Sequence, residues 1–281
     1  MHIFKEIAPL RTYLSSLHSA TSSIGLVPTM GALHQGHLSL IRASKKDNET
    51  TVCSIYVNPT QFGNQEDLEK YPRTLEHDLS LLKSESCDIV FCPDSQQMYG
   101  SAAPLSIAFQ KLDNILEGKF RPGHFSGVAQ VVAKLFNIVE PDLAYFGQKD
   151  YQQVMIISRL VEALKFNVKV ITMPTVREAD GLAMSSRNQR LSPEERKRAS
   201  ILYTCLLQTR DGILAGKTVD RLLASAKLLC LESGVTLEYL AVVDRKDFTL
   251  LDRLTDPNNS VVLIAGQVGP VRLIDNLFVQ P

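Results

Sequence analysis

Runs of β-branched and aromatic residues alternate with segments of helical periodicity through the first 175 residues, and this alternation is the strongest constraint on the fold. Four short runs, each predicted as a strand buried on both faces, are Ile24–Thr29, Thr51–Val57, Asp88–Phe91 and Leu105–Phe109. Strands separated by helices are typical of a parallel sheet, because the crossover helices cover its two faces. We therefore predict an α/β fold built on a Rossmann-like, doubly wound parallel sheet.

The helical segments between and after these runs favour the same fold. Apolar residues recur at helical spacing from Leu75 to Leu82, from Val128 to Val139 and from Val154 to Leu164. Two further strand-like runs, Leu143–Phe146 and Val168–Met173, lie on either side of the last of these helices. A strand–helix–strand order of this kind is the repeating unit of a parallel sheet.

The pattern of residues changes near residue 175, where a polar and irregular stretch begins. The letters SPEE at Ser192–Glu195 combine an N-cap serine, a proline at the first helical position and a glutamate at the third, which predicts a helix start. Two helices and three strands are predicted beyond it. Their ranges are Pro193–Gln208 and Val219–Ser233 for the helices, and Leu237–Val243, Val261–Ala265 and Val271–Phe278 for the strands. We expect a second, smaller α+β domain.

Composition excludes several classes of function. The 30 basic and 30 acidic residues give a net charge of zero, whereas proteins that coat nucleic acid or anionic membranes need a basic excess. No secretory signal is recognised at the start of the chain, and no run reaches the roughly 18 apolar residues of a membrane span. The five cysteines form no CxxC pair, so we expect reduced core thiols in a cytoplasmic protein.

The most informative local motif is PTMGALHQGHLSLI at Pro28–Ile41, which follows a predicted buried strand and continues into a predicted helix. A glycine-bearing loop before a helix N-terminus binds phosphate, because free backbone N–H groups and the helix dipole face the anion. Neither the dinucleotide fingerprint nor the Walker pattern is present. Instead His34 and His37 flank Gly36 as H-x-G-H, and two imidazoles there can donate hydrogen bonds to phosphoryl oxygens. A helix-capping pair or a metal site are the alternatives, although two histidines without a nearby cysteine or carboxylate make a poor metal set.

A second predicted strand end is likewise followed by a glycine, polar residues and a helix start. The letters LAYFGQKDYQQ run from an apolar segment through Gly147 to Lys149 and Asp150, and then into a helix. Ligands of open parallel sheets lie beyond the carboxyl ends of the strands, where the strand order reverses, so both strand ends are expected to serve one site. Lys149 would act as a point charge for phosphate, while Asp150 would cap the helix or bond a ribose hydroxyl.

Three weaker signals complete the candidate site. GLAMSSRN at Gly181–Asn188 offers two hydroxyls and a guanidinium for a polyphosphate, although such a tripeptide is also common in surface loops. Gln61 in YVNPTQF and Gln153 are neutral amides able to hold the hydroxyl and carboxylate groups of a small polar substrate. RPGHFSGV adds Arg121 and His124 before a helix.

Taken together, PTMGALHQGH, FGQKDYQQ and READGLAMSSRN identify the chain as similar to the pantothenate synthetases, or pantoate–β-alanine ligases, of the H-x-G-H nucleotidylyltransferase superfamily. The resemblance extends over essentially the whole chain. It implies an ATP- and pantoate-binding domain over residues 1–175 and a lid-like domain over 176–281. The lid would keep water from a reactive adenylate.

The resemblance also implies a role for individual residues. His37 takes the family's proton-donor position, and His34, Lys149 and Arg187 complete the expected catalytic set. Gln61 matches a residue that contacts both pantoate and β-alanine, and Gln153 matches a pantoate contact. The ATP-binding positions that it implies are Met30, Gly31, Ala32, Leu33, His34, Gln35, Gly36, His37, Gly147, Gln148, Lys149, Asp150, Val176, Met184, Ser185, Ser186 and Arg187.

The implied reaction has two steps. Pantoate attacks the α-phosphorus of ATP to give pantoyl adenylate and pyrophosphate, and β-alanine then attacks the acyl carbon to give pantothenate and AMP. Mg²⁺ is expected with ATP. Its protein ligands are left open, because His77 stands beside Asp78 where some relatives carry a second acid. A homodimer is expected, with no nucleic-acid or membrane partner. Another nucleotidylyltransferase, or a nucleotide sensor without activity, are the rival interpretations.

Overall fold

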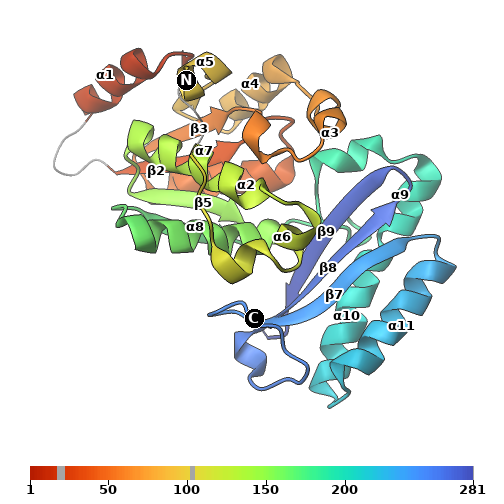
Figure 1. Ribbon diagram of the computed structural model, residues 1–281. Coiled ribbons are helices and arrows are strands. Elements are labelled where there is room, and N and C mark those ends of the chain that lie inside the picture. Colours follow the sequence, from red (N-terminus) through yellow and green to blue (C-terminus); the bar gives the residue numbers. More distant parts are fainter. Residues whose placement is uncertain (18–22, 102–104, 281) are drawn as a thin grey trace. The chain divides into compact units, whose positions relative to one another are not determined.

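The computed structural model describes residues 1–17, 23–101 and 105–280, and the chain divides into two compact units (Figure 1). The first unit is Met1–Gly147 with Gln152–Pro174, and the second is Gln148–Tyr151 with Thr175–Pro281. The short segment Gln148–Tyr151 therefore groups with the C-terminal residues, although it lies between a strand and a helix of the first unit.

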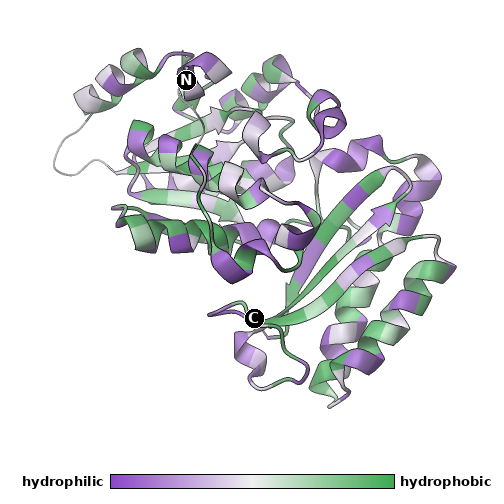
Figure 2. Ribbon diagram, viewed as in Figure 1, coloured by the Kyte–Doolittle hydropathy of each residue, from purple (hydrophilic) through white to green (hydrophobic). Residues whose placement is uncertain are grey.

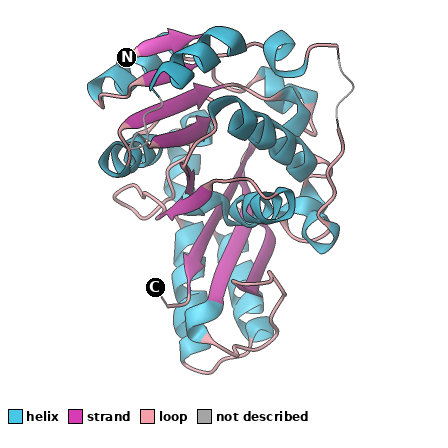
Figure 3. Ribbon diagram, turned by 90° about the vertical axis from the view of Figure 1, so that its left-hand side faces the viewer, coloured by secondary structure: helices cyan, strands magenta, loops and turns pink. Residues whose placement is uncertain are grey.

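The first unit is built on a parallel sheet of six strands, which helices flank, in agreement with the predicted fold class (Figure 3). Its strand order is β1-β4-β3-β2-β5-β6, and every pair is parallel. The strands are β1 (His2–Phe4), β2 (Ile24–Thr29), β3 (Thr50–Ile55), β4 (Ile89–Phe91), β5 (Leu143–Gly147) and β6 (Lys169–Met173). The helices of eight residues or more are α1 (Ile7–Leu17), α2 (Gln35–Asp47), α4 (Leu75–Ser84), α7 (His124–Val139) and α8 (Tyr151–Leu164), the last of which starts in the second unit. Shorter helices are η1 (Pro59–Gln61), α3 (Gln65–Glu69), α5 (Ser95–Tyr99), η2 (Gln110–Asp113) and α6 (Glu117–Phe120).

The second unit pairs an antiparallel sheet of three strands with helices. The sheet order is β7-β8-β9. The elements are η3 (Gln148–Asp150), η4 (Ser186–Arg190), α9 (Pro193–Ala199), α10 (Ile201–Leu214), α11 (Val219–Glu232), β7 (Thr236–Asp244), η5 (Pro257–Asn259), β8 (Ser260–Val268) and β9 (Val271–Phe278). Helix α10 packs on β8 and β9, and α11 packs on β7, which explains the apolar stripes of these helices.

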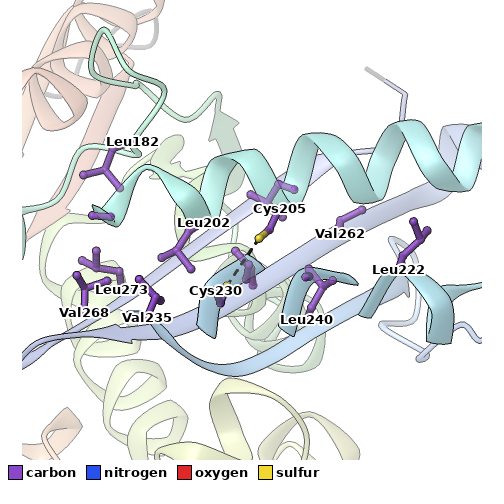
Figure 4. Close-up of a cluster of buried hydrophobic side chains, with 14 of the residues drawn as sticks. Leu182, Leu202, Cys205, Leu222, Cys230, Val235, Leu240, Val262, Val268 and Leu273 are labelled. Atoms are coloured by element: carbon purple, nitrogen blue, oxygen red, sulfur yellow. Dashed lines mark hydrogen bonds between the residues drawn. The ribbon is translucent and has the colours of Figure 1, made fainter. Parts of the chain in front are cut away.

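Each unit buries its own apolar core. Figure 2 shows hydrophobic residues concentrated along the strands of both sheets. In the first unit, Val27 and Val90 on the strands pack with Ile41 of α2 and Leu82 of α4. In the second unit, α10, α11 and the sheet enclose a separate cluster, part of which appears in Figure 4. Two separate cores are the physical basis for two units.

The cysteines are free thiols, as predicted from their number and spacing. Four are buried and Cys92 is half-buried. Burial raises the pKa of Cys87 and of Cys92 to about 11, so both thiols are protonated near neutral pH. Cys205 on α10 and Cys230 on α11 point toward each other with their Sγ atoms 3.7 Å apart (Figure 4).

Two sequence-based expectations about elements were wrong, and one strand was missed. Leu105–Phe109 is not a strand: Leu105 is 74% exposed, and the Ile107 N–H donates to the Ser126 hydroxyl, not to a neighbouring strand. Strand β1 at the sheet edge, which its three-residue length hid, was missed. The helix predicted over Pro193–Gln208 is two helices, because Ser200 ends α9 and begins α10.

Candidate functional site

The strand order of the first unit reverses between β2 and β5. From β2 the chain proceeds through β3 and β4 to one side of the sheet, whereas β5 and β6 extend it to the other. Ligands of doubly wound sheets bind beyond the carboxyl ends of the strands at such a switch point. Strand β2 ends at Thr29, directly before the loop that contains the H-x-G-H motif, and β5 ends at Gly147, one of the expected ATP-binding residues. The topology therefore puts the most informative motif at the edge where this fold binds ligands.

The two histidines of the motif cap helix α2 reciprocally. His34 is the N-cap, and its Nδ1 accepts a hydrogen bond from the Gly36 N–H at 3.1 Å. His37 Nδ1 in turn accepts from the His34 N–H at 3.3 Å. Because both Nδ1 atoms accept, this hydrogen-bond pattern assigns the proton of each neutral ring to Nε2. The capping interpretation is thus correct, and it also makes Nε2–H the donor of each half-buried ring beside a helix N-terminus.

A buried carboxylate holds the loop before these histidines. The two oxygens of Asp78 on α4 accept hydrogen bonds from the Ala32 and Leu33 N–H groups, at 2.9 and 2.8 Å. Thr74 donates its hydroxyl to the same carboxylate. The loop needs such support because Gly31 and Ala32 both have positive φ, 81° and 49°, and the second is not a glycine. Asp78 is fully buried, so its negative charge is balanced by these donors.

Gln61 lies beside the same loop. Its Nε2 donates to the Met30 sulfur at 3.0 Å, so the structure brings together two residues that the sequence places 31 positions apart. The Gln61 Oε1 accepts from Asn58 Nδ2 at 3.1 Å, and Tyr99 donates its hydroxyl to Asn58 Oδ1 at 2.7 Å. Sequence reasoning did not select Asn58 or Tyr99, although Asn58 stands in the same YVNPTQF motif. These contacts fix the rotamer of an amide that is 7% exposed.

The backbone of Gln61 is held by α7. His124 Nδ1 is hydrogen-bonded to the Gln61 carbonyl at 2.8 Å, and Arg121 lies 3.0 Å from His124 Nε2. A Cβ at Gly127 would lie 2.3 Å from the Thr60 carbonyl oxygen, so only glycine allows this close approach of α7 to η1. The RPGHFSGV segment therefore holds the backbone of Gln61, a candidate substrate contact. Its histidine supplies the hydrogen bond and its glycine allows the close approach.

The two glutamines at the start of α8 have different environments. Gln152 is 2% exposed, and its side chain bonds the Glu117 N–H and the Leu112 and Ile115 carbonyls, so it has a structural role. Gln153 is half-buried, and no contact of its amide group is established among the described residues. The local sequence YQQ does not distinguish the two glutamines, whereas their contacts do.

In the second unit, η3 presents Lys149 and Asp150. The Lys149 ammonium lies 3.4 Å from an Asp150 carboxylate oxygen, and its side chain is 19% exposed. Asn276 on β9 donates hydrogen bonds to the Gln148 and Lys149 carbonyls, so this segment is attached to the three-stranded sheet. The lysine thus has a cationic head that can reach an anion and a backbone that is held in place.

The polar stretch after residue 175 is an ordered turn and not an open loop. Met184 N–H donates to the Val176 carbonyl at 3.0 Å, and Arg177 pairs with Ala183 as an antiparallel bridge. The turn is followed by η4, where the Ser185 hydroxyl accepts from the Arg187 N–H at 3.3 Å. Ser186 is buried, and Arg187 is half-buried. The structure therefore brings Val176 and Met184–Arg187 into one continuous feature of this unit.

Helix α9 holds this turn through ion pairs. Arg196 donates to Asp180 at 2.6 Å and to Glu178 at 2.9 Å. The hydrogen bond from Arg196 lowers the pKa of the Asp180 carboxyl. Burial acts to raise the pKa of Glu178, but hydrogen bonds from Arg196 and Asn188 outweigh it, and the net shift is downward. Carboxyl groups with lowered pKa values stabilise the folded state above their unfolded pKa and lose that contribution as the pH falls.

Replacement of Arg196 by alanine should therefore have a pH-dependent effect on stability. At pH 7 we expect a loss of about 1 kcal/mol in the free energy of unfolding, since these pairs are partly exposed and screened by solvent. As the pH falls through the lowered pKa values of Asp180 and Glu178, these carboxyls become protonated in the wild type as well, so the difference in stability between the two proteins should shrink. Urea unfolding at pH 7 and pH 3 measures the difference in the free energy of unfolding between the wild type and the variant. Lys197→Ala, on the exposed side of the same helix, is the control, and an Arg196 effect that is equal at both pH values would contradict the assignment.

The residues that the structure describes do not form a dedicated metal site. Among the described residues there is no group of three or more His, Cys, Asp or Glu side chains that could hold an ion. Both Asp78 oxygens accept backbone N–H groups, so this carboxylate is engaged with the loop. Mg²⁺ commonly binds proteins through substrate phosphates with few protein ligands, and the described residues are compatible with that mode.

The fold and the H-x-G-H loop define an α/β protein with two histidines at a helix N-terminus beside the switch point of a parallel sheet. A model of the family described as pantoate-beta-alanine ligase matches residues 2–278. The chain belongs to this family.

Individual relatives agree with the family assignment over the full chain. The pantothenate synthetase of Carboxydothermus hydrogenoformans is 45% identical, with 100% of this chain and 99% of the relative covered. The crystal structure of pantothenate synthetase from Thermus thermophilus has a TM-score of 0.92 and 41% identity, and both chains are covered fully. A pantoate-beta-alanine ligase structure from Francisella tularensis, described as complexed with beta-gamma ATP and beta-alanine, has a TM-score of 0.84 and 37% identity, with 99% of this chain and 98% of that one covered.

No helix in the described ranges is both long enough and apolar enough to cross a membrane.

Proposed function

We infer that this protein is a pantoate–β-alanine ligase, which joins (R)-pantoate to β-alanine with cleavage of ATP to AMP and pyrophosphate. The single observation that carries this inference is the family match across residues 2–278, together with an intact H-x-G-H loop at the switch point of the sheet. The related Francisella protein is described as a complex with an ATP compound and β-alanine, which are two of the three substrates of this reaction.

In the first step, a pantoate carboxylate oxygen bonds to the α-phosphorus of ATP while the bond from that phosphorus to the pyrophosphate oxygen breaks. Negative charge accumulates on the phosphoryl oxygens during this displacement. The Nε2–H groups of His34 and His37 would stabilise that charge by donating hydrogen bonds, and the dipole of α2 would add to the effect. Because capping already orients both rings, little reorganisation is needed when the transition state forms.

The second unit supplies the remaining cationic groups of the proposal. Lys149 and Arg187 would bind the phosphates. The neighbouring residues of η3 and of the turn would contact the ribose, the adenine and the phosphate oxygens; these residues are Gln148, Asp150, Val176 and Met184–Ser186. In the first unit, residues 30–36 and Gly147 would line the ATP site.

Two amides would hold pantoate. Gln61, with its rotamer held by Asn58, would contact pantoate and then β-alanine, and Gln153 would contact pantoate from α8. In the second step the β-alanine amine attacks the acyl carbon of the adenylate, AMP leaves with the bonding electron pair, and the amine loses its proton. We also assign residues 176–281 the role of a lid that limits hydrolysis of the adenylate, to be tested by hydrogen exchange with and without ATP and pantoate.

Three further properties belong to the proposal. Mg²⁺ would enter with ATP and neutralise phosphate charge. The protein would act as a homodimer, which light scattering can test. The cytoplasm is the expected compartment, which the set of free thiols favours.

The decisive assay is the formation of AMP by purified protein. We expect AMP to require ATP, pantoate and β-alanine together, with pantothenate appearing in equal amount. A rival nucleotidylyltransferase would release pyrophosphate and keep AMP in its product without any need for β-alanine. That outcome would overturn the ligase assignment.

Gln153→Ala should separate pantoate binding from ATP binding. We expect the KM for pantoate to rise about 10-fold or more while the KM for ATP changes little, because the lost hydrogen bond concerns one substrate. Initial rates with each substrate varied in turn measure the split. Gln152→Ala is the matched control: its amide bonds only the protein, so it should lower thermal stability and leave the ratio of the two KM values unchanged.

A further inference from the structure

Strand β9 carries two adjacent buried polar residues that sequence reasoning did not select. Asp275 is 4% exposed and Asn276 is 1% exposed, in a strand that otherwise presents apolar residues such as Leu273 to the core of the second unit. Buried polar side chains cost free energy unless they are fully hydrogen-bonded. The hydrogen-bond partners of Asp275 and Asn276 therefore indicate which segments the two residues stabilise.

The Asn276 side chain is used completely on η3. Its Nδ2 donates to the Gln148 carbonyl at 2.8 Å and to the Lys149 carbonyl at 2.9 Å. Its Oδ1 accepts from the Gln148 side chain at 3.0 Å. One amide therefore makes three hydrogen bonds to two consecutive residues, one of which is Lys149. The contact crosses more than 120 positions of sequence and fixes the backbone from which the lysine extends.

The neighbouring Asp275 holds the other candidate segment of this unit. It accepts from both terminal nitrogens of Arg177, at 2.6 and 3.0 Å, which is the bidentate geometry of a strong ion pair. Arg177 also donates to the Gly181 carbonyl, and its guanidinium lies over the Tyr203 ring at 4.1 Å from the centroid. The turn that begins at Val176 and leads to η4 is thereby attached to the same two residues of β9.

Electrostatics agree with this geometry. Burial raises the pKa of the Asp275 carboxyl above its ordinary value, while Arg177 and, more weakly, Lys149 act to lower it. Lys149 is thus close enough to Asp275 for its charge to be felt there. Both charged groups attached to β9 belong to segments expected to bind ATP.

We propose that Asp275 and Asn276 are positioning residues, which hold η3 and the turn after Val176 in the register that lets both segments engage one nucleotide. Neither residue touches ATP; Asn276 acts through Lys149 and Asp275 through Arg177. The inference rests on the proposed function for the role of Lys149. A displacement of about 1 Å in a phosphate-binding cation is enough to cost on the order of 100-fold in rate, so backbone support of this kind has a measurable effect.

The test compares Asn276→Ala, Lys149→Ala and the double variant. We expect Asn276→Ala to lower kcat/KM for ATP about 30-fold, with less than about 3-fold change in the KM for pantoate. In the double variant, kcat/KM for ATP should be within about 3-fold of that of Lys149→Ala alone, because removal of the lysine removes what Asn276 positions. Losses that multiply in the double variant would overturn the proposal.

Asn259→Ala is the matched control. Its side-chain amide also donates to a partner in the second unit, Asp244, but makes no contact with η3. Both variants should lose some thermal stability, and only Asn276→Ala should lose ATP kinetics. Equal kinetics in the two variants would overturn the proposal, since the role of Asn276 would then be structural alone.

A second variant and a second measurement keep the two inferences separate. If Asn276→Ala does not fold, Asn276→Asp retains the shape but sets an oxygen against two carbonyls, and the same loss is expected. If the wild type forms no pantoate-dependent AMP, the proposed function fails alone. The present inference is then decided by the rise in melting temperature with ATP, which Asn276→Ala should reduce and Asn259→Ala should not; equal rises would overturn it.

Discussion

Replacement of His37 by alanine should lower the rate of pantoyl adenylate formation by about 100-fold or more, because a donor aimed at developing phosphoryl charge is lost. The same variant removes the acceptor for the His34 N–H, so the free energy of unfolding should also fall, by about 1 kcal/mol. Single-turnover quench experiments with ATP and pantoate measure the first effect, and urea unfolding measures the second.

Two conservative variants separate the capping role of His37 from its donor role. Asparagine places an oxygen near the Nδ1 position and keeps the cap, whereas glutamine places an amide nitrogen near the Nε2 position and keeps a donor. We expect His37→Asn to be stable but slow, and His37→Gln to retain more adenylation activity. His77→Ala, an exposed histidine on α4, should change neither property. Near-normal single-turnover adenylation by His37→Ala would refute the assigned role.

Replacement of Asp78 by asparagine should have a comparable effect on ATP kinetics through a different cause. The carboxylate accepts two consecutive backbone N–H groups, and an asparagine would turn an NH₂ group toward one of them. A buried N–H without an acceptor costs about 1–3 kcal/mol, so stability should fall by about that amount. The positive-φ turn at Gly31 and Ala32 would then relax, and kcat/KM for ATP should fall about 100-fold.

Asp94→Asn is the matched control for Asp78→Asn. Asp94 also accepts a backbone N–H, from Gln97 at the start of α5, but it is exposed and has no contact with the loop. It should lose a few tenths of a kcal/mol at most, with ATP kinetics intact. Normal ATP kinetics in a destabilised Asp78→Asn would show that Asp78 supports folding only and that the loop keeps its conformation without it.

Local patterns in the sequence were sufficient for most elements of the fold. Ser192–Glu195 was predicted as a helix start, and the structure confirms a reciprocal capping box there, because capping depends on residues within one turn. The apolar periodicity of α8 likewise reflects the face that it buries, whereas α7 is buried around most of its circumference. The prediction for Leu105–Phe109 was wrong because its apolar residues are compatible with a strand, whereas in the structure the Ile107 N–H donates to the Ser126 hydroxyl.

For the candidate site, motifs predicted which residues carry the chemistry, but contacts distant in sequence decide how those residues are held. The H-x-G-H letters do not show that Asp78 clamps the loop, since 45 or more positions separate the partners. Similarly, LIDNLF gives no sign that Asn276 holds Lys149. Gln152 and Gln153 are adjacent and chemically identical, and only packing assigns the first to structure.

The sequence by itself therefore determined the α/β class and the family resemblance, and it supplied the prediction of which residues bind phosphate. Strand periodicity, capping and motif spacing depend on residues that are close together in the chain, so they can be recognised from the sequence alone. The tertiary structure alone decided the switch point between β2 and β5, the left-handed turn supported by Asp78 and the attachment of η3 to β9. These features depend on buried hydrogen bonds between segments that are distant in the sequence. Such bonds form when folding brings the segments together, because a buried polar group without a partner costs free energy.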